Sequence, residues 1–182
     1  MSLADKLSFS RIILIPVFVS LLIYSKTHPI LRFVAVGVFI VAVLTDFFDG
    51  LVARIKKEKS EFGQIIDPLA DKLLLLTAFI SIYFLKFPIY LWVVLVVVSR
   101  DLILLLGFGI LHFLKIDITI SPSIWGKVTT FLQMFTILWV LIGIPHHFYI
   151  CVAVIIFTLI SGFDYLRRGA REINAKIHPS TN

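Results

Sequence analysis

The sequence is poor in the residues that build disulfide scaffolds and zinc sites. Cysteine occurs once, as Cys151 within an apolar run, so the chain cannot form an internal disulfide. We expect this cysteine to be a small packing residue. The five histidines show no metal-ligand spacing, and none is assigned to a metal. Internal repeats and low-complexity segments are also lacking, so one domain is expected over residues 1–182.

The composition is instead dominated by apolar residues. Hydrophobic side chains make up 59% of the chain, and the mean hydropathy is +1.03. Soluble domains lie near ~45–50% apolar, so this excess indicates an integral membrane protein. The formal charge of +6 could suggest a nucleic-acid partner. We expect none, because the positive residues cluster between apolar runs, where a membrane surface explains them better.

The apolar residues form runs close to the ~20 residues that cross the hydrocarbon layer. The predicted fold is therefore an all-α integral membrane bundle with six transmembrane helices. The first run contains Pro16 and no cleavage pattern follows it, so it is expected to remain as a span. Residues 1–8 are expected at the interface, and 166–182 form a basic tail. The predicted spans are 9–24, 31–52, 65–86, 88–113, 124–144 and 148–165.

Lysine and arginine are distributed unequally between the two sides of this bundle. Only Lys26, Arg32 and Lys86 fall on one side, and the remaining clusters fall on the other. Because cytoplasmic loops carry the excess of positive charge, both termini are predicted to be cytoplasmic in the cell's cytoplasmic membrane. The connector between the second and third spans then also faces the cytoplasm.

Four aspartates lie at the edges of the two apolar runs that flank this connector. Asp46 and Asp49 are three residues apart, and Asp67 and Asp71 are four apart, so each pair shares one face of a helix. Acidic groups in membrane spans are rare and usually mark a site. If the two helices pair in antiparallel fashion, the four carboxylates converge and need cations. Oxygen ligands select Mg²⁺ or Mn²⁺, and two such ions would cancel the charge.

The residues around the aspartates suit a phosphate ligand. Gly50 and Ala53 continue the face of the first pair and leave a recess, and Gly63 falls where the second helix would begin. Arg54 could bind a phosphate with two hydrogen bonds. Metal-assisted phosphoryl or phosphatidyl transfer needs such a set. Interfacial charges paired with lysine and arginine are the simpler alternative.

The whole motif resembles the signature of the CDP-alcohol phosphotransferase family. The resemblance implies a homodimeric six-helix membrane enzyme that uses a CDP-linked lipid. It implies that Asp46, Asp49 and Asp67 hold the metals and that Asp71 is both a ligand and the general base. The CDP-binding residues implied in this way are Asp46, Asp49, Gly50, Ala53, Arg54, Gly63 and Asp67. The motif reads Asp46-x-x-Asp49-Gly50-x-x-Ala53-Arg54, then Gly63-x-x-x-Asp67-x-x-x-Asp71.

Two cations bear on the second substrate, the acceptor alcohol. Arg100 and Lys127 lie in or beside spans and together could bind an acceptor phosphate. A buried ion pair with Asp101 is the alternative role of Arg100, and an interfacial, snorkelling side chain is that of Lys127. The stretch 122–133 resembles family members that transfer to glycerol 3-phosphate. The Arg100-Asp101 pair is more like the members that form cardiolipin.

The predicted reaction is transfer of the phosphatidyl group from CDP-diacylglycerol to glycerol 3-phosphate with release of CMP. Phosphatidylglycerol or another alcohol is the alternative acceptor. A non-enzymatic cation carrier is an alternative of another class. The pattern of Gly50, Ala53 and Arg54 argues against a carrier, because a cation pathway gains nothing from an arginine beside its ligands.

Overall fold

The computed structural model describes residues 3–56, 61–113 and 123–177, where all regular structure is helical. Side chains are described for residues 12–45, 72–107, 109 and 123–171. The prediction of an all-α chain with six helices is confirmed over the described ranges. The helices are α1 (Leu3–Tyr24), α2 (Ile30–Lys56), α3 (Glu61–Phe84), α4 (Leu91–Phe113), α5 (Ile124–Ile142) and α6 (His147–Ile177).

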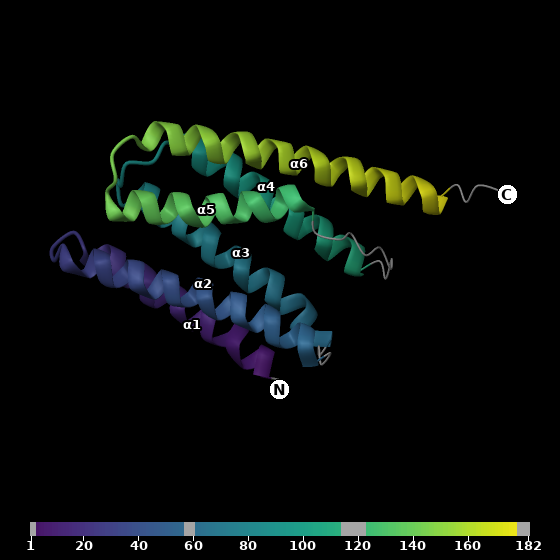
Figure 1. Ribbon diagram of the computed structural model, residues 1–182, viewed down its shortest axis with the longest axis horizontal. Coiled ribbons are helices and arrows are strands. Elements are labelled where there is room, and N and C mark those ends of the chain that lie inside the picture. Colours follow the sequence, from purple (N-terminus) through teal and green to yellow (C-terminus); the bar gives the residue numbers. More distant parts are fainter. Residues whose placement is uncertain (1–2, 57–60, 114–122, 178–182) are drawn as a thin grey trace.

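Successive helices run in alternating directions, so the chain turns at two opposite ends of one bundle (Figure 1). We call the end with the turns at 25–29, 85–90 and 143–146 the loop end. The other end, where α2 finishes at Lys56 and α3 begins at Glu61, is the signature end. The last residue of α4, the first of α5 and the last of α6 also lie there (Figure 1).

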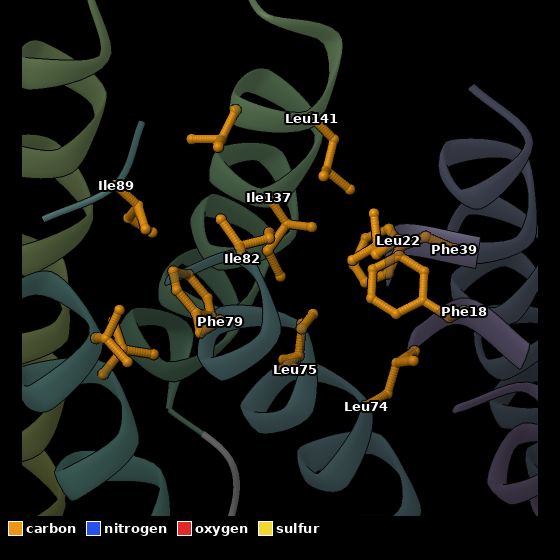
Figure 2. Packing of buried hydrophobic residues seen from close by; sticks show 14 of the residues in the cluster. Phe18, Leu22, Phe39, Leu74, Leu75, Phe79, Ile82, Ile89, Ile137 and Leu141 are labelled. Carbon is orange, nitrogen blue, oxygen red and sulfur yellow. The ribbon is translucent and has the colours of Figure 1, made fainter. Parts of the chain in front are cut away.

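A continuous apolar core joins the helices. α1 packs along both α2 and α3, and α5 packs along α6. Figure 2 shows Phe18 and Leu75 directed toward the same interior as Phe79 and Ile137. The rings of Phe18 and Phe39 lie 5.6 Å apart between centroids. In lipid, van der Waals contacts between buried side chains of this size are the main favourable term for packing these helices together.

Several helices continue past the ends of their apolar runs. α1 starts at Leu3, within the segment predicted to lie at the interface, and α6 extends to Ile177, through most of the predicted basic tail. α2 likewise continues to Lys56, so it includes part of the predicted charged connector. Lysine, arginine, glutamate and alanine are good helix formers. A polar sequence therefore ends the apolar run without ending the helix.

The two ends of α5 are defined by side chains and backbone. Ser123 is the N-cap, and its hydroxyl accepts a 3.0 Å hydrogen bond from the Gly126 N–H. Gly143 ends the helix with a φ of 84°, a left-handed conformation that suits glycine. Arg32 of α2 donates to the carbonyl oxygens of Val140 and Leu141. These contacts satisfy carbonyl groups that a helix C-terminus leaves free.

The surface of the bundle is rich in exposed apolar side chains. By length and composition, α5 and the stretch His147–Arg171 of α6 could each cross a membrane, within the part of the chain that is described. Shorter apolar helical stretches are Ile12–Tyr24, Ile30–Thr45 and Lys72–Phe84. Large side chains such as Phe84, Phe131 and Phe163 are mostly exposed. Such a surface indicates contact with lipid rather than with water.

Candidate functional site

The aspartate signature lies on two helices that meet at the signature end. Asp46, Asp49, Gly50, Ala53 and Arg54 lie on α2, and Gly63, Asp67 and Asp71 lie on α3. The two helices run in opposite directions and are separated by only residues 57–60 (Figure 1). This backbone arrangement is the one in which the signature residues were expected to converge.

Both aspartate pairs occur in uninterrupted helix. Asp46 and Asp49 therefore lie within one turn of α2, and Asp67 and Asp71 lie about one turn apart on α3. The side chains of all the signature residues lie outside those that the structure describes. Their predicted roles as metal and CDP ligands therefore stay predictions.

The donor set fits hard divalent cations. Two carboxylates per helix, each pair spaced by one turn, offer the oxygen ligands that Mg²⁺ and Mn²⁺ prefer. Among the side chains that are described, no three histidine, cysteine, aspartate or glutamate residues gather as a metal site. The signature aspartates are not in that described set, so they remain the candidates for metal binding.

Next to the signature, Lys72 connects α3 with the second half of the bundle. Its ammonium lies 3.6 Å from the Asp101 carboxylate on α4 and donates a 3.3 Å hydrogen bond to the Thr130 hydroxyl on α5. Lys72 therefore contacts an aspartate outside the signature. The contact with Asp101 had no sequence signal, because it depends on how α3 and α4 are rotated against each other.

Asp101 and Arg100 form the buried ion pair that was one reading of the sequence. The Arg100 Nη1 donates a 2.6 Å hydrogen bond to Asp101 Oδ1, and Arg100 Nη2 donates a 2.5 Å bond to the Ser161 hydroxyl on α6. Asp101 is completely buried and Arg100 is 8% exposed. Together with Lys72 and Thr130, these residues form one group, which we call the polar cluster: Lys72, Arg100, Asp101, Thr130 and Ser161.

The start of α5 lies directly against this cluster. A Cβ atom at Gly126 would lie 3.7 Å from both Arg100 Nη2 and the Ser161 hydroxyl. The guanidinium therefore packs against the first turn of α5. Lys127 follows Gly126 in that turn and has an exposed side chain. The structure thus places Arg100 close to the backbone beside Lys127, and their role in binding an acceptor phosphate stays a prediction.

A groove borders the polar cluster on its apolar side. It has a volume of about 600 Å³ and lies between α4 and α6. Its lining is mainly aliphatic and aromatic, including Leu95, Ile103 and Phe163, and Arg100 contributes to its wall. Arg100 therefore lies at the border between a polar interior and a surface suited to lipid. No pattern in the sequence indicates this groove, because its walls come from α4 and α6, which are not consecutive.

Comparison with known proteins decides the family. The model of the CDP-alcohol phosphatidyltransferase family matches residues 1–163. The chain belongs to this family. The prediction made from the aspartate signature is therefore confirmed. Membership of a transferase family also removes the reason for considering a non-enzymatic cation carrier.

Several curated relatives are similar over most of their length. A probable phosphatidylglycerophosphate synthase of Mycobacterium tuberculosis is 36% identical over 179 residues, which are 94% of this chain and 83% of the relative. A CDP-diacylglycerol–glycerol-3-phosphate 3-phosphatidyltransferase of Rickettsia bellii is 32% identical over 143 residues, 78% of this chain and 76% of that protein. The Bacillus subtilis protein of the same name is 26% identical over 192 residues, 92% and 94% of the two chains.

Proposed function

We propose that this family member is a phosphatidylglycerophosphate synthase, which transfers the phosphatidyl group of CDP-diacylglycerol to sn-glycerol 3-phosphate. Relatives named for this reaction, similar over most of both chains, support the acceptor. The observation that carries the proposal is the position of Arg100 against the start of α5, next to Lys127. Two cations at this place suit an acceptor that carries a phosphate.

The signature aspartates supply the donor side of the site. Asp46, Asp49, Asp67 and Asp71 would hold two Mg²⁺ or Mn²⁺ ions. Such ions, when bound, screen phosphate oxygens and stabilise the leaving group. Gly50 and Ala53 would leave room for the cytidine, Arg54 would contact the diphosphate, and Gly63 would be a further CDP-binding residue.

The chemical step is a displacement at phosphorus. The Asp71 carboxylate takes the proton from the terminal hydroxyl of glycerol 3-phosphate as its oxygen attacks the lipid-side phosphorus of CDP-diacylglycerol. A new P–O bond forms to the acceptor, and the P–O bond to the CMP phosphate breaks. CMP leaves with the bonding electron pair, and Asp71 holds the proton. Arg100 and Lys127 hold the acceptor phosphate and so align the attacking hydroxyl.

The orientation and assembly of the enzyme belong to the same proposal. The cations Lys26 and Arg32 gather at the loop end, where both lie over the Phe87 ring at 4.8 and 5.4 Å. Lys86 also lies at the loop end, and Lys72 and Arg100 lie near the middle of α3 and α4. The remaining cations with described side chains lie toward the signature end: Lys127, Arg167, Arg168 and Arg171. This asymmetry supports cytoplasmic termini and a cytoplasmic signature end. Glycerol 3-phosphate would then enter from the cytosol and the lipid from the inner leaflet.

By family resemblance the enzyme would assemble as a homodimer.

The proposal is tested with purified protein in detergent with Mg²⁺ and CDP-diacylglycerol. Glycerol 3-phosphate, phosphatidylglycerol and uncharged glycerol are offered separately, and CMP release is measured. We expect release with glycerol 3-phosphate and formation of phosphatidylglycerophosphate. Release with phosphatidylglycerol alone, giving a lipid with four acyl chains, would overturn the acceptor and identify a cardiolipin synthase.

A further inference from the structure

Asp101 is a completely buried carboxylate that contacts cations from two helices. Its Oδ1 lies 2.6 Å from Arg100 Nη1 and 3.6 Å from Lys72 Nζ. A buried charge is costly to maintain unless it is paired and hydrogen-bonded. Here one carboxylate is shared between a cation of α3 and a cation of α4.

The two cations belong to opposite sides of the proposed reaction. Lys72 follows Asp71, the proposed base, directly along α3. Arg100 reaches Ser161 on α6 and the first turn of α5, where Lys127 lies. Asp101 therefore joins the helix carrying the base to Arg100, while the hydrogen bond from Lys72 to Thr130 joins the same helix to α5.

The charges of this arrangement suit a phosphate monoester. Asp101 neutralises one of the two positive charges of Lys72 and Arg100, so these three residues together keep one positive charge. Lys127 adds a second. A phosphate monoester carries about −1.5 to −2 charges near neutral pH. Arg100 Nε has no hydrogen-bond partner among the described residues, so one buried donor remains for a ligand.

We propose that Asp101 is a positioning residue that sets the distance and direction between the base on α3 and the acceptor-phosphate site on α4 and α5. This inference rests on the proposed function. Asp101 does not touch the substrates. It acts by holding the Arg100 guanidinium against the start of α5 and the Lys72 ammonium against α4. Loss of its charge therefore weakens use of the phosphorylated acceptor while leaving use of the CDP-linked lipid nearly unchanged.

The experiment compares Asp101→Asn, Asp101→Glu, Lys72→Met and the double variant Asp101→Asn/Lys72→Met with the parent protein. Initial rates of CMP release are measured against glycerol 3-phosphate at saturating CDP-diacylglycerol, and then the reverse. Thr136→Val is the matched control, because the buried Thr136 hydroxyl donates to Leu132 of its own helix and to no other helix among the described side chains. Elution volume and thermal unfolding report the fold of each variant.

For Asp101→Asn we expect kcat/KM for glycerol 3-phosphate to fall about 10- to 100-fold, by analogy with residues that orient the ligands of a metal. The KM for CDP-diacylglycerol should change less than about twofold. Asp101→Glu keeps the carboxylate and should retain most activity. The double variant should lose no more than the worse single variant, because both act through one contact.

Equal changes in both KM values, or additive losses in the double variant, would overturn the positioning role. If the parent protein uses glycerol 3-phosphate and Asp101→Asn is as active as the parent, the positioning role is also overturned. If Asp101→Asn does not fold, the double variant, which also removes the lysine partner, takes its place. The changes in its KM for glycerol 3-phosphate and its KM for CDP-diacylglycerol are then compared in the same way. A parent that releases CMP only with another alcohol overturns the proposed function and this inference together.

Discussion

The guanidinium of Arg100 donates a 2.5 Å hydrogen bond to the hydroxyl of Ser161, although the two residues are 61 positions apart in the chain. The bond joins the middle of α4 to α6 across a buried region, since Ser161 is 1% exposed. It also fixes the direction of the Arg100 guanidinium, whose other hydrogen bond among the described residues goes to Asp101. A hydrogen bond to a charged group contributes more than one between neutral groups.

Replacement of Ser161 by alanine should therefore loosen Arg100. We expect kcat/KM for glycerol 3-phosphate to fall about fivefold, which corresponds to roughly 1 kcal/mol for one hydrogen bond. Initial-rate measurements of CMP release check this. Thr158→Val is the control on the same helix, because within the described part of the chain the Thr158 hydroxyl donates just to the Val154 carbonyl oxygen. A fall of the same size in Thr158→Val would show that the loss is general.

Asp71→Asn should abolish turnover while leaving the fold intact. The amide cannot accept the acceptor's proton, and general-base help is typically worth ~10²–10⁴-fold in rate. CMP release measures the loss, and gel filtration measures the fold. Asp46→Asn is the comparison, because a weakened metal ligand should be partly rescued by more Mg²⁺. Recovery of Asp71→Asn at high Mg²⁺ would contradict its role as the base.

The positions of the helices were predictable because the chain divides into long apolar runs separated by polar or proline-containing connectors. The ends of the helices were less predictable. Hydropathy indicates where the chain leaves the lipid, whereas helix propensity decides how far the helical backbone continues beyond that point. Residues 166–177 illustrate this difference. They carry Arg167, Arg168 and Arg171 and were predicted as a tail, yet α6 continues through them.

The candidate site was predictable only where sequence spacing sets geometry. Residues three or four apart share a helix face in any helix, so the aspartate pairs could be recognised without a structure. The neighbouring pair of Arg100 and Asp101 could be suspected for a similar reason. The contact of Asp101 with Lys72 depends on the rotation and offset of α3 against α4, which side-chain packing decides. No local pattern in the sequence reports such a contact.

Lys127→Ala should raise the KM for glycerol 3-phosphate about tenfold and leave the KM for CDP-diacylglycerol nearly unchanged. A charge-assisted contact to phosphate is worth roughly 1.5–3 kcal/mol, and the exposure of the lysine places it at the low end. Lys127→Arg should keep most of the affinity. Lys26→Ala is the control, because Lys26 lies at the loop end over the Phe87 ring. Equal effects on both KM values would remove Lys127 from the acceptor pocket.

The end of α5 offers a test of stability that does not involve the site. A Cβ at Gly143 would lie 2.7 Å from Arg32 Nη2, and the φ of +84° strains any residue with a side chain. Gly143→Ala should therefore lower the free energy of unfolding by about 1–2 kcal/mol.

Arg32→Met should destabilise the protein by a similar amount, because the Val140 and Leu141 carbonyl oxygens lose a charged donor. Thermal unfolding in detergent measures both variants. Lys26→Met is the matched control. Both cations lie over the Phe87 ring, but of the two only Arg32 is seen to donate to the end of α5 in the described residues. The control should cost only about 0.5–1 kcal/mol. If Lys26→Met lowered the melting temperature as much as Arg32→Met, contact with the ring would account for the effect, and Arg32 would not be a cap of α5.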